Sequence, residues 1–222
     1  MASGGPEQAR VGVLGSGVVG QRLAAGFASR GHEVMIGSRD PSKPELTEWL
    51  AGDGAGVKAG TFQQTAEHGQ ILVLAVFGDA AEPAIADAGA ANFSGKLVID
   101  AMNPLDFSGG FPPKLSISGE DSLGERVQRL LPDANVVKAF NTIGNQYFVD
   151  PAFSQGAPTM LIAGDDEGAK QAVTHILAEF GWSDVVETSA ASRDHANSRR
   201  SASCGSRSAA RAGPGTTASS CS

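Results

Sequence analysis

The chain has 222 residues, of which 41% are hydrophobic and 18% are charged, and its formal net charge at pH 7 is −7. This length allows one α/β domain with a modest appendage, and the negative charge argues against a nucleic-acid partner. No run approaches the roughly 18 apolar residues of a membrane span, and residues 1–6 lack the basic and apolar regions of a signal peptide. We therefore expect a cytoplasmic protein without a membrane partner.

The first predicted elements are a buried strand, a glycine-rich turn and a helix. The apolar run V-G-V-L at 11–14 stops on Gly15, Ser16, Gly17, Val18, Val19 and Gly20. In such a G-x-G-x-x-G turn, the first glycine permits the tight turn and the second lets the backbone approach a pyrophosphate. The third lets the helix pack against the strand. A helix over 18–30 would direct its free N–H groups at the phosphates, so the pattern predicts a dinucleotide site.

The residues after the second predicted strand, 32–36, bear on which dinucleotide is bound. A site selective for NAD places an acidic residue there, about 20 positions past the glycines, to hold the ribose hydroxyls. This chain has Ser38 and Arg39 instead, with Lys43 four residues on. These side chains suit a 2′-phosphate, so we expect NADP, although Asp40 is discordant and lies past the strand end. The alternative is that Arg39 and Lys43 are solvated loop charges.

Strands and helices alternate along the rest of the chain. The further strands are predicted at 57–59, 71–76, 96–101, 135–140, 159–163 and 184–187. Helices are predicted at 62–68, 79–90, 123–131 and 165–180, and a long Gly/Pro/Ser loop at 102–122. This alternation predicts an α/β fold, namely a Rossmann-like, doubly wound and mainly parallel sheet of about eight strands. A ligand should bind outside the carboxyl ends of the strands, and the long loop is expected to be functional.

The last 34 residues have a different composition. Residues 189–222 contain no Val, Ile, Leu, Phe, Trp or Tyr, and they hold five arginines but one acid. Such a segment cannot bury a core, so we predict a disordered tail, either a frameshifted end of the gene or a genuine basic tail. Cys204 and Cys221 both lie in it without metal-ligand spacing, so we expect no metal site. The predicted domains are a flexible N-terminus at 1–9, an NADP-binding domain at 10–188 and this tail.

Five sequence blocks together resemble the NADPH-dependent coenzyme F420 reductase family. They are G-S-G-V-V-G at 15–20, G-H-E-V-M-I-G-S-R at 31–39, L-A-V-F at 74–77, D-A-M-N-P-L at 100–105 and V-V-K-A-F-N-T-I-G at 136–144. The K-A-F-N-T stretch is also similar to the cytosolic domain of six-transmembrane ferric reductases. The resemblance covers about residues 10–188. It implies hydride transfer between NADP(H) and a small-molecule redox acceptor, which would be the deazaflavin coenzyme F420 or a flavin (FMN or FAD).

The resemblance also implies a set of cofactor contacts. It places Ser16, Gly17, Val18 and Val19 on the pyrophosphate, Ser38, Arg39 and Lys43 on the 2′-phosphate, Val76 and Ala80 beside the adenosine and its ribose, and Asn103 and Asn145 near the nicotinamide. Their positions after successive strands agree with binding at the point where the strand order reverses. The alternatives without ligand binding are that Val76 is a core residue and that Asn103 belongs to a simple turn.

No residue pattern predicts a catalytic acid or base, so we name no catalytic residue. None of the four histidines has persuasive spacing to a nucleophile or carboxylate. Hydride transfer between two planar rings requires chiefly orientation and exclusion of water, so a dedicated acid or base is not obligatory.

The chain departs from the family pattern in two places. The family carries further helices after the last strand, which contribute to the acceptor pocket and to the dimer contact, whereas this chain has the Ser/Arg/Ala tail there. Phe77-Gly78 stands where relatives often carry Pro-Trp. Whether the chain forms a homodimer is therefore left open. Two other functions are alternatives to the reductase. One is a catalytically silent NADP-binding module or redox sensor. The other is a 3-hydroxyacid dehydrogenase-like enzyme, although no G-x-x-x-K on a long helix after the nucleotide domain supports its catalytic lysine.

Overall fold

The structure is a computed structural model that describes residues 8–106, 108–117, 121–154 and 156–189. Almost all of the tail predicted at 189–222, both cysteines and most of the predicted N-terminal segment lie outside the described residues.

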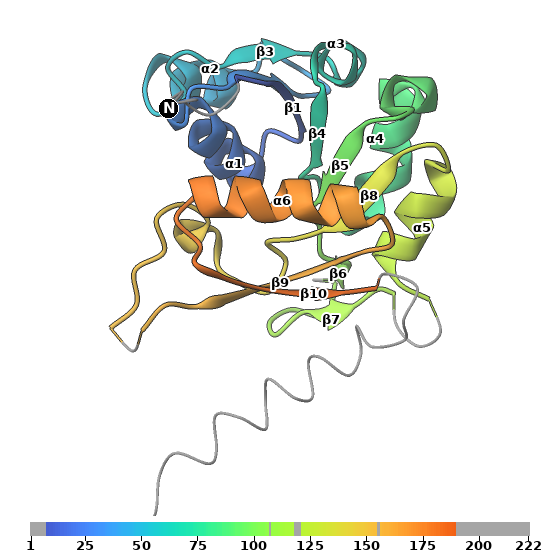
Figure 1. Ribbon diagram of the computed structural model, residues 1–222. Coiled ribbons are helices and arrows are strands. Elements are labelled where there is room, and N and C mark those ends of the chain that lie inside the picture. Colours follow the sequence, from blue (N-terminus) through green and yellow to red (C-terminus); the bar gives the residue numbers. More distant parts are fainter. Residues whose placement is uncertain (1–7, 107, 118–120, 155, 190–222) are drawn as a thin grey trace, which may run out of the picture. The chain divides into compact units, whose positions relative to one another are not determined.

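One eight-stranded sheet organises the described residues (Figure 1). In spatial order its strands are β10 (Asp184–Thr188), β9 (Thr159–Gly164), β8 (Asn135–Lys138), β5 (Leu97–Asp100), β4 (Ile71–Leu74), β1 (Arg10–Leu14), β2 (Glu33–Gly37) and β3 (Lys58–Gly60). All neighbouring pairs are parallel except β8 and β9. The predicted Rossmann-like, mainly parallel sheet of eight strands is confirmed.

Helices cover both faces of this sheet because alternate strand residues are apolar on both sides. The α-helices are α1 (Val18–Ser29), α2 (Pro44–Ala51), α3 (Phe62–His68), α4 (Ala81–Ala88), α5 (Leu123–Leu130) and α6 (Glu167–Glu179). Buried residues of α1, α2 and α6 share one core with strand residues such as Val13 and Ile99. Those of α3, α4 and α5 share a second core with strand residues such as Leu72 and Val98. The sheet is thereby buried on both faces, which agrees with the continuous apolar run at 71–74.

Several element boundaries differ from the prediction. The strands predicted at 71–76, 96–101 and 135–140 are each shorter and end at Leu74, Asp100 and Lys138, at the carboxyl edge of the sheet. The helix predicted at 79–90 is divided into a 3₁₀ turn η1 (Gly78–Ala80), helix α4 and a 3₁₀ turn η2 (Ala90–Phe93). Gly89, at φ +78°, ends α4, because this backbone conformation interrupts a right-handed helix.

One helix and one two-stranded hairpin were not predicted. Helix α2 follows the residues after β2, with Pro44 at its first turn and Leu46 buried beneath it. The predicted loop 102–122 contains a short hairpin, in which β6 (Leu105–Asp106) pairs antiparallel with β7 (Lys114–Leu115). Both the helix and the hairpin are short, so they leave only a weak periodic pattern of apolar residues in the sequence.

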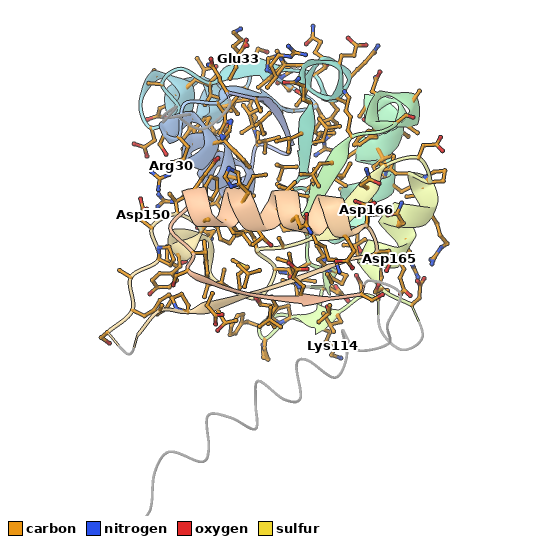
Figure 2. The ribbon with its side chains drawn as sticks, viewed as in Figure 1. Arg30, Glu33, Lys114, Asp150, Asp165 and Asp166 are labelled. Carbon is orange, nitrogen blue, oxygen red and sulfur yellow. The ribbon has the colours of Figure 1, made fainter. Side chains whose placement is uncertain are left out.

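The direction of β9 was also not predicted. The residues described between 139 and 158 form the 3₁₀ turn η3 (Asn145–Tyr147) and no α-helix that would carry the chain back to the amino edge before β9 begins. Strand β9 therefore runs antiparallel to β8. An ion pair of 2.6 Å between Arg30 and Asp150 joins this connection to the end of α1 (Figure 2).

Candidate functional site

The glycine-rich turn follows β1 at the carboxyl edge of the sheet. Gly15 has φ +123°, and a Cβ atom built on it would lie 2.4 Å from the carbonyl oxygen of Ala75. A Cβ atom on Gly20 would lie 1.8 Å from the carbonyl oxygen of Gly15. Around Gly17, in contrast, a Cβ atom would meet nothing within 4 Å. Packing thus requires the first and third glycines, whereas the second borders open space that a ligand can fill.

Helix α1 begins at this open space. Its N-cap is Gly17, no side-chain hydrogen bond caps it, and its first turn holds no acidic residue. The first N–H groups of α1 and its positive dipole end are therefore left for an anion. Two hydrogen bonds brace the turn itself: the Gly15 N–H donates to the Gly37 carbonyl at 3.0 Å, and Gln21 Nε2 donates to the Ser16 carbonyl at 3.3 Å. Val19 is half-buried against the first core behind this turn.

The end of β2 brings a small cationic group next to the glycine turn. Ser38 is buried, and its N–H donates to the Gly60 carbonyl at 3.0 Å. Arg39 is exposed and Lys43 is half-buried at the N-cap of α2. Neither cation forms an ion pair with another described residue. Both positive charges are therefore available to a ligand anion.

Asp40, the discordant acid, is engaged within its own turn. Its carboxylate accepts hydrogen bonds from the Ser42 hydroxyl at 2.7 Å and the Ser42 N–H at 3.0 Å. The Ser42 hydroxyl, then the Ser42 N–H and the nearby charge of Lys43 lower the pKa of Asp40. Hydrogen bonds from Ser42 and the charge of Lys43 thus partly offset the negative charge of Asp40.

The loop after β4 forms the next part of the edge. Val76 is half-buried and packs against the second core, and Ala80 is half-buried in η1. Phe77 is 75% exposed. Gly78 lies so close to the following loop that a Cβ atom would be 2.7 Å from the Pro104 Cα atom and 2.8 Å from the Asn103 carbonyl oxygen. The loops after β4 and β5 are therefore packed together.

Asn103 lies in the loop after β5. Its Nδ2 group donates to the Asn141 carbonyl at 3.1 Å, which joins this loop to the one after β8. Its Oδ1 atom is buried and has no hydrogen-bond partner among the described residues. Asn145 is half-buried in η3, which lies against α1. The structure thus places both asparagines after their strands, but no hydrogen bond between described residues joins Asn145 to the other predicted site residues.

A buried ion pair at this edge had no role in the sequence interpretation. Asp100 ends β5 and Lys138 ends β8, and their side chains meet at 2.9 Å. The only sequence signal was a charged residue at the end of each of two strands expected to be buried.

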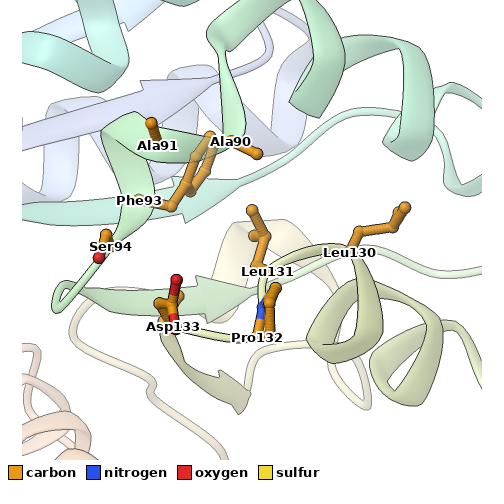
Figure 3. Close-up of a pocket in the computed structure, with 9 residues that line it drawn as sticks. Ala90, Ala91, Phe93, Ser94, Leu130, Leu131, Pro132 and Asp133 are labelled. Carbon is orange, nitrogen blue, oxygen red and sulfur yellow. The ribbon is translucent and has the colours of Figure 1, made fainter.

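The hollow in Figure 3 lies at the other end of the sheet, where β5 and β8 begin. It has a volume of about 300 Å³, and none of the predicted site residues lines it. Its lining residues are Ala90, Ala91, Phe93, Ser94, Leu130, Leu131, Pro132, Asp133 and Ala134. It is mostly apolar and is separate from the carboxyl edge.

The histidines described by the structure lie away from the glycine turn. His32 is buried before β2, where Nδ1 accepts from the Ala9 N–H at 3.2 Å and Nε2 faces Glu179 at 3.0 Å. His68 ends α3, and His175 contacts Glu179 from the surface of α6. In the described part of the chain, no group of three or more His, Cys, Asp or Glu side chains is placed to hold a metal ion. Likewise, none of its helices is both long and apolar enough to cross a membrane.

Comparison with known proteins links this geometry to one family. The family model described as NADP oxidoreductase, coenzyme F420-dependent, matches residues 10–104. A crystal structure of a putative F420-dependent NADP reductase from Arthrobacter sp. FB24 is 37% identical and has a TM-score of 0.77. The match covers 82% of this chain and 85% of that one.

Two curated proteins are also similar. The F420-dependent NADP reductase of Methanothermobacter marburgensis is 33% identical over 150 residues, which cover 64% of this chain and 66% of the reductase. Metalloreductase STEAP3 of Rattus norvegicus is 29% identical over 189 residues, which cover 84% of this chain and 35% of the metalloreductase. The chain therefore spans just under two thirds of the first protein and about one third of the second.

Proposed function

The chain belongs to the coenzyme F420-dependent NADP oxidoreductase family, and on that premise we propose that it transfers a hydride between NADP(H) and a deazaflavin or flavin acceptor. The observation that carries the proposal is the combination of an open, uncapped glycine turn with two cations beside it, Arg39 and Lys43, which form no ion pair with another described residue. A neutral ligand would need neither feature. A dinucleotide with a 2′-phosphate needs both.

The described residues fit NADP at both of its anionic groups. Backbone N–H groups at Ser16, Gly17, Val18 and Val19 would bind the pyrophosphate, because the space around Gly17 is empty and the start of α1 has no capping side chain. The Ser38 hydroxyl, the Arg39 guanidinium and the Lys43 ammonium would bind the 2′-phosphate.

The remaining contacts extend along the same edge. Val76 and Ala80, in the loop after β4, would flank the adenosine and its ribose, and Asn103 and Asn145 would lie near the nicotinamide. Since the carboxyl ends of parallel strands meet at one edge, these residues reach a common ligand although they are far apart in the sequence.

The chemistry proposed for this site needs orientation more than proton transfer. When bound, NADPH would supply a hydride from its nicotinamide ring, and the acceptor would take up that hydride together with a proton from water. The chain's own residues bind the phosphates, fix the ring end of the cofactor and exclude water. Phe77, which is 75% exposed beside this edge, offers an apolar face that a planar acceptor such as coenzyme F420, FMN or FAD would cover.

The experiment mixes the protein with NADPH and, in turn, coenzyme F420, FMN and FAD, and follows absorbance at 340 nm. Oxidation with at least one acceptor is the expected result. Saturable NADPH binding without oxidation by any acceptor would contradict the enzyme and support a silent binding module.

Cofactor preference is tested with Arg39→Ala. Loss of one charge-assisted phosphate contact should weaken NADPH binding by about tenfold to a hundredfold, while NADH binding, which lacks the 2′-phosphate, changes little. The matched control is Arg129→Ala, which removes an exposed arginine on α5, a helix on the other face of the sheet from α1. Equal losses for NADPH and NADH in Arg39→Ala would refute the 2′-phosphate contact.

A further inference from the structure

Asp100 and Lys138 form a buried ion pair at a place in the sheet that apolar side chains could also fill. Asp100 is the last residue of β5, Lys138 is the last residue of β8, and the two are direct neighbours in the strand register. The Asp100 side chain is fully buried, and that of Lys138 is 11% exposed. Replacing such a buried pair with apolar residues often leaves a protein equally stable or more stable, so its presence points to a geometric role.

The pair fixes the backbone of the residue before Asn103. Lys138 Nζ donates to Asp100 Oδ2 at 2.9 Å and to the Met102 carbonyl at 2.8 Å. Asp100 Oδ1 accepts from the Met102 N–H at 2.9 Å. Both polar groups of the Met102 peptide backbone are thus held by this one pair, so the direction in which the chain enters Asn103 is set by it.

Two unfavourable features lie beside the pair: one at Asn103, which follows Met102, and one at Phe140, two residues after Lys138. The Oδ1 atom of Asn103 is buried without a partner among the described residues, which costs free energy until a donor reaches it. Phe140 has φ +63°, a rare conformation for a bulky residue, and the next residue, Asn141, supplies the carbonyl that holds Asn103 Nδ2. Strained backbone clusters at functional sites, and a buried acceptor without a partner calls for an explanation such as a ligand donor.

We propose that Asp100 and Lys138 are positioning residues that fix the turn 101–104 for the nicotinamide end of the bound dinucleotide. The inference rests on the proposed function, because that function brings the nicotinamide to Asn103. The nicotinamide carboxamide carries an NH₂ group, which is the kind of donor that the Asn103 oxygen lacks. The pair touches neither ring nor phosphate and acts through the Met102 backbone.

The test compares two ligands that share the phosphate half. NADPH carries the nicotinamide, whereas 2′,5′-ADP has the adenosine and the 2′-phosphate without it. The double variant Asp100→Asn, Lys138→Met removes both charges, so that no lone buried charge threatens the fold. We expect about tenfold weaker NADPH binding and a lower kcat, with 2′,5′-ADP binding unchanged, because one ligand hydrogen bond is misplaced.

The matched control is Lys96→Met. Lys96 directly precedes the same strand, β5, at its other end, and its Nζ donates to the Ala66 carbonyl at 2.8 Å. This variant also loses a lysine that bonds to a backbone carbonyl, but it leaves the carboxyl edge intact, so both ligands should bind as they do to the wild type. Thermal unfolding of each variant monitors the fold.

Equal loss of affinity for both ligands, or no loss for either, would overturn the positioning role. So would a wild-type protein that binds 2′,5′-ADP but not NADPH. If the wild type binds NADPH and no acceptor oxidises it, the proposed reaction fails on its own, while the ratio of the two affinities still decides the role of Asp100 and Lys138.

Discussion

Substituting alanine for the second and third glycines of the turn should separate ligand binding from folding. At Gly17 the backbone has φ −81° and ψ 179°, which alanine adopts freely, and a Cβ atom meets nothing within 4 Å. Alanine loses less conformational freedom on folding but is a poorer N-cap than glycine, and each effect is a few tenths to about 1 kcal/mol. These effects oppose each other, so the unfolding free energy of Gly17→Ala should stay close to that of the wild type.

Gly20→Ala should instead destabilise the fold. The new Cβ atom would lie 1.8 Å from the Gly15 carbonyl oxygen, which belongs to the backbone and cannot rotate away. Overpacking of this kind costs roughly 1–3 kcal/mol, and the gain of about 1 kcal/mol from alanine in a helix offsets only part of it. The net loss is therefore up to about 2 kcal/mol, and a loss of about 2 kcal/mol corresponds to a fall of roughly 4–8 °C in the unfolding midpoint of a domain this size.

Gly17→Ala should weaken NADPH binding although it leaves the stability of the fold nearly unchanged. In Gly17→Ala the methyl group occupies space next to the N–H groups proposed for the pyrophosphate, and losing one hydrogen bond to a charged group costs about 1.5–3 kcal/mol. NADPH should therefore bind at least tenfold more weakly while the midpoint stays unchanged. Thermal unfolding followed by circular dichroism and NADPH titration followed by fluorescence measure the two quantities. A Gly17→Ala protein with wild-type affinity, or one destabilised as much as Gly20→Ala, would refute the reasoning.

Two further predictions concern stability. Trp182→Phe should cost about 1–3 kcal/mol, seen as a lower unfolding midpoint, because the buried Trp182 Nε1 donates to the Phe148 carbonyl at 2.9 Å and the variant leaves that acceptor unpaired. Hydrogen bonds from Arg126 and then Arg129 lower the pKa of Asp121 to about 2, so this carboxylate stabilises the folded state above its unfolded pKa near 4 and the contribution is lost as the pH falls from 4 to 2. The group is partly exposed, so the effect is small, and it should disappear from an acid titration of stability when both arginines are replaced by alanine; an unchanged acid profile would contradict the assignment.

Local patterns predicted the first half of the fold well. The apolar run before Gly15, the glycine spacing and the next apolar strand correspond to β1, α1 and β2, and the predicted helix 62–68 has the bounds of α3. These features show in short stretches of sequence: the glycine spacing of the turn, in which Gly20 packs against Gly15, and the continuous apolar run of a strand buried on both faces. Helix α2 was missed because its eight residues hold one buried apolar position, Leu46, and so show little periodicity.

The amino-acid sequence by itself determined that the glycine turn follows a buried strand and that Ser38 and Arg39 stand where an acid would select NAD. It also placed Asn103 and Asn145 after their strands. Only the tertiary structure decided that β9 runs antiparallel to β8, that Gly78 packs under the loop at Asn103, and that Asp100 meets Lys138 across 38 positions of sequence. The physical reason is the range of the interactions. Local backbone and burial preferences show as repeating patterns over a few residues. Strand order and register instead bring together residues far apart in the sequence, and such pairs produce no repeating pattern.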